Sequence, residues 1–197
     1  MADRKVVIDK RALLLDDYFK VEAVQVSYEK FDGTMGAPVR RLDLVRGDAV
    51  AAVLFNKARQ CVILVNQFRY ATLSLGGGWM TEVVAGVVDE GELPEDAIRR
   101  EILEEAGYEI EKLERISCFY PTPGITSERI ILFYAETRGD GPVAKGGGLA
   151  EEGEDIKVLE LPLDEAFRQL DSGEIADAKT IIGLMWLKAR VVPRNSG

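Results

Sequence analysis

The segment that decides the fold is GVVDEGELPEDAIRREILEEAGY, residues 86–108. Pro94 suits the first turn of a helix, and the two acidic residues that follow it complement the positive end of the helix dipole. Gly107 is a typical C-terminal stop. The segment therefore predicts a helix over about residues 94–106, entered from a strand and a loop.

Acidic residues recur along this helix at intervals of three and four, which places Glu101, Glu104 and Glu105 on one face. We expect Ala97 on that same face. The opposite, apolar face is expected to pack on a core through Ile98, Ile102 and Ala106. Like charges at these intervals cost a few tenths of a kcal/mol per pair, so the acids do not serve the stability of the helix.

Carboxylate oxygens are the ligands that Mg²⁺ and Mn²⁺ prefer, and magnesium sites usually combine few carboxylates with waters and substrate phosphates. The acidic face is therefore predicted to bind Mg²⁺, with Mn²⁺ as the alternative ion. A solvated acidic face is the competing interpretation of a lone charge run. The repeated spacing favours the metal.

The chain has 197 residues, a formal net charge of −9 and no histidine. The negative charge disfavours nucleic acid and anionic membranes as partners, so an anionic substrate must be drawn in by local arginines and bound metal. The lack of histidine excludes Ser-His-Asp and Cys-His catalysis and HExxH zinc sites. The chemistry must therefore depend on carboxylates and metal-activated water.

No apolar run is long enough to span a membrane, and the first residues lack the hydrophobic segment of a signal peptide. We expect a cytoplasmic protein with one main domain. Cys61 and Cys118 form no metal-binding pattern, and both are predicted to be buried, reduced thiols.

Residues 1–45 are predicted to form a small N-terminal β unit, because residues 21–31 alternate in polarity and Asp32-Gly33 suits a hairpin turn. Residues 46–197 are predicted to form the main domain. Strands are expected at residues 49–55, 61–68, 80–88, 116–120, 130–135 and 156–160. Two further helices are expected at about residues 164–170 and 177–191. This order predicts a mixed α/β fold.

Gly86, five residues, Glu92, seven residues and the run REILEEAG closely resemble the Nudix box, the signature of hydrolases that act on a nucleoside diphosphate linked to another group. The family usually has an aliphatic residue at the final position, where this chain has Tyr108. The resemblance implies an α/β/α sandwich around a mixed β-sheet. It also implies Mg²⁺-dependent hydrolysis of a pyrophosphate bond.

The resemblance assigns roles to the residues of the box. Glu101 and Glu105 are expected to bind the metal together with the backbone carbonyl of Ala85. Glu104 is expected to be a further ligand or a partner of the ligands. Support of the site is expected from Gly86, Glu92, Arg100 and Gly107, with the arginine paired to Glu92.

Pro123 lies sixteen residues after Gly107 and resembles the proline mark of the ADP-ribose pyrophosphatase branch, with an ordinary Pro-Gly turn as the alternative. Gln67-Phe68-Arg69 is similar to the same branch, in which the arginine approaches the substrate. Other segments resemble the enterobacterial GDP-mannose pyrophosphatases, among them Gly146-Gly147-Gly148, Glu154-Asp155-Ile156 and Lys179-Thr180. The expected substrate is a nucleoside diphosphate sugar, GDP-mannose or ADP-ribose.

In this branch a carboxylate from a loop after the box completes the metal site or acts as the base. Residues 139–155 form the long loop here, and Glu152 and Glu154 are the favoured candidates. Glu128 is their rival. The three consecutive glycines are expected to act as a hinge that lets the loop close. Phosphate contacts are expected from Arg69 and Arg129, because a guanidinium matches phosphate oxygens bidentately.

Enzymes that the chain resembles are homodimers with exchanged N-terminal β units, so we expect a homodimer built through residues 1–45. Two alternative functions stay open at this point. A hydrolase of oxidised nucleoside triphosphates shares the box but does not need Pro123 or the N-terminal unit. A non-catalytic nucleotide-sugar sensor usually loses box carboxylates, and this chain keeps them.

Overall fold

The structure is a computed structural model that describes residues 4–191, with the side chain of Glu152 left out. The chain separates into two compact units. The first contains Met1–Gly47 and Thr122–Arg129, and the second contains Asp48–Pro121 and Ile130–Gly197. A segment from the middle of the chain therefore belongs with the N-terminal strands. No helix in the described part of the chain is long and apolar enough to cross a membrane.

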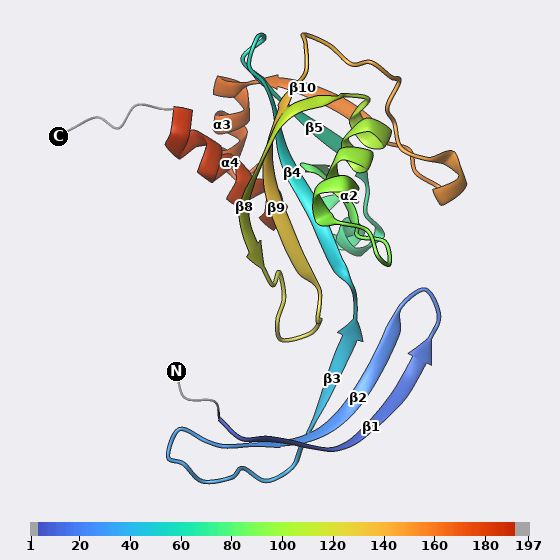
Figure 1. Ribbon diagram of the computed structural model, residues 1–197, viewed down its shortest axis with the longest axis vertical. Helices are drawn as coiled ribbons and strands as arrows, with labels where there is room; N and C mark the ends of the chain where they lie inside the picture. The colour runs from blue at the N-terminus through green and yellow to red at the C-terminus, as the bar shows by residue number, and fades with distance from the viewer. Residues whose placement is uncertain (1–3, 192–197) are drawn as a thin grey trace, which may run out of the picture. The chain divides into compact units, whose positions relative to one another are not determined.

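The first unit is built on an antiparallel sheet in the order β1-β2-β3, drawn in blue in Figure 1. Its strands are β1 Val6–Asp16, β2 Lys20–Tyr28 and β3 Val39–Val45. The turn predicted at Asp32-Gly33 is confirmed: Gly33 has a φ of 82°, and the Lys30 amide donates to the Thr34 carbonyl at 2.8 Å. Glycine adopts this left-handed conformation without steric cost.

Segment Thr122–Arg129 attaches to the end of β3. The Leu44 amide donates to the Ile125 carbonyl at 2.9 Å, and the Thr126 hydroxyl donates to the Leu44 carbonyl at 2.8 Å. The Arg46 amide donates to the Ser127 hydroxyl at 3.1 Å. These bonds make the segment an integral part of the first unit.

The second unit contains a seven-stranded mixed sheet in the order β10-β5-β4-β9-β8, with β6 paired to β5 and β7 paired to β4. Its strands are β4 Asp48–Asn56, β5 Cys61–Phe68, β6 Trp79–Glu82, β7 Val84–Val87, β8 Ile110–Phe119, β9 Arg129–Thr137 and β10 Lys157–Pro162. The predicted pair at residues 49–55 and 61–68 is thus confirmed as β4 and β5.

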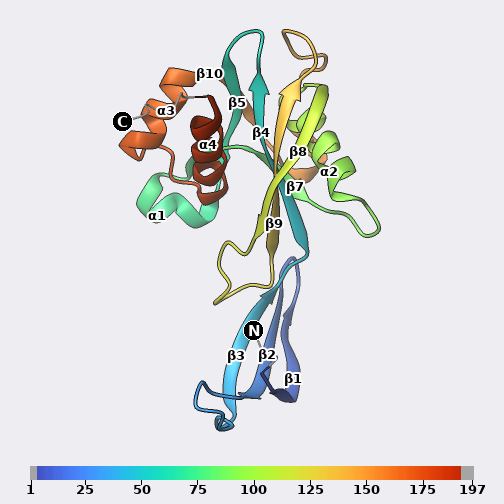
Figure 2. The same cartoon turned by 60° about the vertical axis from the view of Figure 1, so that its left-hand side comes forward.

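Helices cover both faces of this sheet, as Figures 1 and 2 show. Helix α2, Pro94–Glu101, lies on one face, and α3, Leu163–Ser172, and α4, Ala178–Val191, lie on the other. Short helical turns complete the unit: η1 Tyr70–Thr72, α1 Leu73–Gly76, η2 Ile102–Ala106 and η3 Ala150–Glu152. The predicted α/β sandwich around a mixed sheet is confirmed.

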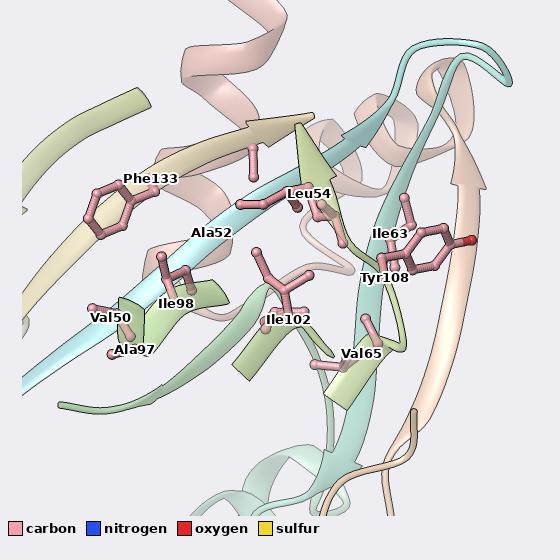
Figure 3. Packing of buried hydrophobic residues seen from close by; sticks show 14 of the residues in the cluster. Val50, Ala52, Leu54, Ile63, Val65, Ala97, Ile98, Ile102, Tyr108 and Phe133 are labelled. Atoms are coloured by element: carbon pink, nitrogen blue, oxygen red, sulfur yellow. The ribbon is translucent and has the colours of Figure 1, made fainter. Parts of the chain in front are cut away.

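Two hydrophobic cores form because successive residues of a strand point to opposite faces of the sheet. Val50, Ala52 and Leu54 of β4 pack with the apolar side of the box helix, including Ile98 of α2 and Ile102 of η2 (Figure 3). The alternate β4 residues pack with α3 and α4 in the second cluster. Burying one such aliphatic side chain contributes about 1.5–3 kcal/mol. The box helix is therefore fastened to the central strand of the sheet.

Three expectations are corrected here. The strand predicted at residues 80–88 breaks at Val83 into β6 and β7, because the first piece pairs with β5 and the second with β4. Ala97 is fully buried in the core and is not part of an open acidic face. Cys61 is buried as predicted, but Cys118 is exposed, since it lies on β8 at the edge of the sheet.

Candidate active site

The box helix begins at Pro94 as α2 and continues after Glu101 as a π-helical turn, Ile102–Ala106. Gly107 ends it with a φ of 77°. The predicted extent of the helix is confirmed, but the regular 3.6-residue repeat is not. π-Helical turns are rare and occur often at functional sites. The widened turn carries Glu104 and Glu105 and sets the directions of their carboxylates.

Glu105 is the most buried acid of the box, with 2% of its surface exposed. Its Oε2 accepts a hydrogen bond from the Ala85 amide at 3.2 Å. Burial, helped by the charges of Glu101 and Glu154, raises the pKa of Glu105 to about 8, although the Ala85 amide and Arg69 oppose the shift. An acid in this setting lacks full compensation for its charge, and a cation would supply it.

Glu101 lies directly against the backbone of Gly86. A Cβ atom added to Gly86 would overlap the Glu101 carboxylate, so only glycine leaves room for this arrangement. Burial raises the pKa of Glu101, and the neighbouring Arg100 opposes that shift. Strand β7 thus contributes two contacts to the acidic cluster, the Ala85 amide and the bare α-carbon of Gly86.

Arg100 is the centre of an ion-pair cluster. Its Nε and Nη2 donate to the two carboxylate oxygens of Glu92, each at 3.1 Å. Its Nη1 donates to Glu101 at 2.8 Å and to Glu104 at 3.1 Å. The pKa of Arg100 lies above its usual value, and its hydrogen bonds with Glu92 are the main cause. The arginine therefore holds the loop before the helix and orients two acids of the helix.

The loop after β9 caps the end of the box helix. The amides of Gly147 and Gly148 donate to the carbonyls of Glu105 and Glu104, at 2.8 and 3.1 Å. A Cβ on Gly146 would overlap the backbone of Glu105 and Ala106. The last carbonyls of a helix lack partners within the helix, and the loop supplies them here. Gly147 and Gly148 are thus hydrogen-bonded to the helix end in this structure, and the hinge expected at the three glycines stays a prediction.

Glu154 is the loop carboxylate that the structure brings to the acidic cluster. It contributes to the raised pKa of both Glu101 and Glu105. Its Oε2 accepts a hydrogen bond from the Leu149 amide at 2.9 Å. Glu151 and Asp155 of the same loop are exposed, and the side chain of Glu152 lies outside the described residues.

Arg69 is paired with the carboxylate of Glu82. Its Nε and Nη2 donate to the two oxygens of Glu82, at 3.0 and 2.9 Å. Burial by itself raises the pKa of Glu82, but Arg69 and Lys179 together bring it below its usual value. Arg69 also opposes the raised pKa of Glu105, which places its charge within electrostatic reach of the box acids.

Three of the predicted site residues belong to the first unit: Pro123, Glu128 and Arg129. Glu128 pairs there with Arg46, with an Nε to Oε1 distance of 3.4 Å. Arg129 is the first residue of β9. The roles expected of these three residues stay predictions.

Several residues of this region were not identified from the sequence as site residues. Glu82 carries no motif of its own, and its partner Lys179 is 97 residues away. Tyr108, the departure from the Nudix pattern, is buried and donates from its hydroxyl to Glu160 at 2.6 Å. Glu160 also pairs with Arg59. The aromatic residue thus ties the end of the box helix to β10.

The donor set fits a hard divalent cation. Glu101 and Glu105 carry the carboxylate oxygens that such an ion prefers, Glu154 adds negative charge beside them, and burial raises the pKa of Glu105. Within residues 4–191, no three Asp, Glu, Cys or His side chains are grouped closely enough to hold a metal ion in this arrangement. Arg100 bonds to Glu101 and Glu104 in this arrangement.

Residues 45–183 match the NUDIX domain, so the chain belongs to the Nudix family and is a Nudix hydrolase. Members of this family use divalent metal ions. The chain is 35% identical over 185 residues to an ADP-ribose pyrophosphatase of Escherichia coli K12, which covers 93% of this chain and 88% of the relative.

It is 36% identical over 186 residues to a GDP-mannose pyrophosphatase of Citrobacter koseri, which covers 93% of this chain and 95% of the relative. A solved structure described as an ADP compounds hydrolase superposes with a TM-score of 0.72 at 21% identity, covering 97% of this chain and 98% of the other. At that identity the superposition supports the fold.

Proposed function

We propose that this enzyme hydrolyses the pyrophosphate bond of a nucleoside diphosphate sugar, GDP-mannose or ADP-ribose, to a nucleoside monophosphate and a sugar phosphate. The observation that carries the proposal is the acidic cluster in which Glu105 bonds to the Ala85 amide and Glu101 lies against Gly86. The names of the curated relatives, ADP-ribose pyrophosphatase and GDP-mannose pyrophosphatase, supply the substrate class.

The proposed cofactor is Mg²⁺, held by Glu101, Glu105 and the Ala85 carbonyl, with Glu104 as a further ligand or partner. When bound, the ion neutralises charge on the pyrophosphate oxygens and orients an attacking water. Arg100 keeps the acids oriented through its four hydrogen bonds to Glu92, Glu101 and Glu104. The box helix therefore acts as a rigid support whose carboxylates are aimed before the substrate arrives.

We assign the proton-accepting role to Glu154, with Glu152 and Glu128 as alternatives. The contacts of Gly147 and Gly148 with the helix end fix the base of the loop, and the Leu149 amide orients the Glu154 carboxylate. A general base must lie within hydrogen-bond reach of the proton that it accepts. The electrostatic effect of Glu154 on both Glu101 and Glu105 supports a position beside the reacting water.

Arg69 and Arg129 are proposed to bind the substrate phosphates, and Pro123 to shape the substrate pocket. The pair with Glu82 fixes the plane of the Arg69 guanidinium, which favours a defined contact with phosphate oxygens. We also propose a cytoplasmic location for the enzyme, as predicted from the sequence.

The proposed activity is tested by incubating the protein with GDP-mannose, ADP-ribose and an oxidised guanosine triphosphate in parallel, with Mg²⁺ and with EDTA. We expect one diphosphate sugar to be cleaved to a monophosphate and a sugar phosphate, and EDTA to abolish the reaction. Faster release of pyrophosphate from the triphosphate would contradict the proposed substrate class. Cleavage of none of the three would favour the sensor function.

We further propose that the chain is a homodimer assembled through its N-terminal β unit, residues 1–45, with residues 46–197 as the hydrolase domain. Sheet β1-β2-β3 leaves large apolar side chains exposed, among them Leu13, Leu14, Leu15 and Leu42. Apolar groups gathered on a surface commonly mark a protein interface.

Sedimentation analysis tests the proposed dimer. The protein is expected to sediment at twice the 21.8 kDa mass of one chain. Leu14→Lys should shift it toward the monomer, because a charge would have to be buried in the interface. Gln25→Lys is the matched control, since Gln25 is an exposed polar residue of β2. A wild-type protein that sediments as a monomer would refute the proposal.

A further inference from the structure

Arg69 is the end of a chain of four charged side chains. Glu82 accepts hydrogen bonds from Arg69 and, through its Oε2, from the Lys179 ammonium at 2.9 Å. The same ammonium donates to Asp177 at 3.0 Å. The order Arg69, Glu82, Lys179, Asp177 therefore alternates in sign. It connects the first turn of α4 to the proposed phosphate-binding arginine.

The interior of this chain is shielded from water. The Glu82 and Lys179 side chains are 4% and 13% exposed, whereas the Arg69 side chain is 43% exposed. A buried ion pair pays a large desolvation penalty and is weak evidence for stability, and well-packed apolar residues often serve stability as well. The network is better explained by its effect on Arg69, its most exposed member, whose side chain it holds in one position.

The first turn of α4 holds Lys179 in place. The Asp177 carboxylate accepts hydrogen bonds from the Thr180 amide at 2.9 Å and from the Thr180 hydroxyl. The Thr180 hydroxyl in turn accepts a hydrogen bond from the Val83 amide at 2.8 Å. Residue 83 directly follows Glu82, so the backbone beside Glu82 and the ammonium that binds its side chain are anchored to the same helical turn.

The charge of Lys179 has a consequence for Arg69. Glu82 divides its Oε2 between the two cations, so Lys179 offsets part of the negative charge that Arg69 would otherwise neutralise alone. Without Lys179, Arg69 would face two acids, Glu82 and Asp177. Its guanidinium would be drawn toward them and less of its charge would be available to a phosphate.

We infer that Lys179 is a positioning residue for the substrate: through Glu82 it holds Arg69 in the orientation that binds the phosphates of a nucleoside diphosphate. The inference rests on the proposed function, in which Arg69 contacts phosphate. It adds helix α4 to the elements that build the site. Lys179 itself is not assigned a contact with substrate or metal.

The test is a double-mutant cycle on steady-state kinetics, with the diphosphate sugar that the protein cleaves and saturating Mg²⁺. Arg69→Ala should raise KM by about 10-fold or more, and Lys179→Met by about 5-fold, with kcat nearly unchanged, because the lost contact binds substrate and transition state alike. Lys179→Met in the Arg69→Ala background should add nothing, since Lys179 acts through Arg69.

Lys188→Met is the matched control. Lys188 lies on the same helix and pairs with Asp171 at 2.6 Å on the surface, so its loss should leave KM unchanged. Lys179→Arg keeps the positive charge and should return KM to near the wild-type value. If the methionine variant does not fold, Lys179→Gln takes its place in the cycle as the variant that removes the charge.

The outcomes distinguish the positioning role of Lys179 from the proposed function of the enzyme. If Arg69→Ala raises KM while Lys179→Met leaves it unchanged, or if the two effects multiply in the double variant, the positioning role is overturned and the function stands. If Arg69→Ala leaves KM unchanged, the assignment of Arg69 to phosphate fails first. A Lys179→Met variant that loses only thermal stability and kcat through a smaller folded fraction would show a merely structural role, which also overturns the inference.

Discussion

Glu105→Gln is expected to lower turnover by on the order of 10³-fold at saturating substrate and Mg²⁺, because the amide keeps the shape of the side chain but not the charge that binds the cation. The measurement is kcat with titrated Mg²⁺, together with the Mg²⁺ affinity from calorimetry. Glu95→Gln, an exposed acid of the first turn of α2, is the matched control and should retain activity. Full turnover in Glu105→Gln would remove this residue from the metal site.

The same variant is expected to be more stable than the wild type when EDTA is present. The pKa of Glu105 is about 8 in the folded protein and 4.5 in the unfolded chain, so unfolding releases a proton between these values. The free energy of unfolding of the wild type should therefore fall as the pH rises from about 4.5 to about 8. The slope for one proton is about 1.4 kcal/mol per pH unit.

Glu105→Gln lacks the titrating group and should lose this slope. Chemical denaturation of both proteins in EDTA from pH 5 to pH 9 measures the difference. Addition of Mg²⁺ should stabilise the wild type most at the upper end of this range, because the deprotonated carboxylate binds the ion. A constant difference between the two proteins at every pH would show that Glu105 is not a buried acid with uncompensated charge.

Gly86→Ala is expected to lower kcat by on the order of 10²-fold, because its methyl group would occupy the position of the Glu101 carboxylate and displace it by an ångström or more. Gly141→Ala is the matched control: no atom lies within 4 Å of its added Cβ, and its φ is not positive. Circular dichroism and thermal unfolding establish that the variant is folded.

A second variant tests the cause of the Gly86→Ala defect. Glu101→Asp in the Gly86→Ala background shortens the side chain by one methylene and should recover part of the activity by relieving the overlap. Activity in Gly86→Ala equal to that of the control would contradict the close contact. If the double variant recovers no activity, the defect comes from the strand backbone and not from the overlap with Glu101.

The box residues could be predicted from sequence because their spacing is local. Glu92 and Arg100 are eight residues apart, and a helix brings the arginine back over the preceding loop. The apolar side of the helix, with Ile98 and Ile102, could be predicted equally well, because both residues fall on one helix face. Motif and periodicity therefore gave the fold class and the acidic cluster.

Other features depend on contacts that periodicity does not contain. The π-helical turn departs from the 3.6-residue repeat on which the assignment of helix faces relied. The break at Val83 follows from two different pairing partners, β5 and β4. Exposure of Cys118 follows from the place of β8 in the sheet order, and the ion pair of Glu82 with Lys179 joins distant segments.

The attachment of Thr122–Arg129 to the N-terminal strands also has a consequence for synthesis on the ribosome. Strands β1 to β3 emerge before the box helix, but their unit lacks a segment until residue 129 has been added. At about 5–20 residues per second, this delay is on the order of 4–16 s. The box helix is translated within that interval. The unit of β1 to β3 is therefore completed only after the box helix has been synthesised.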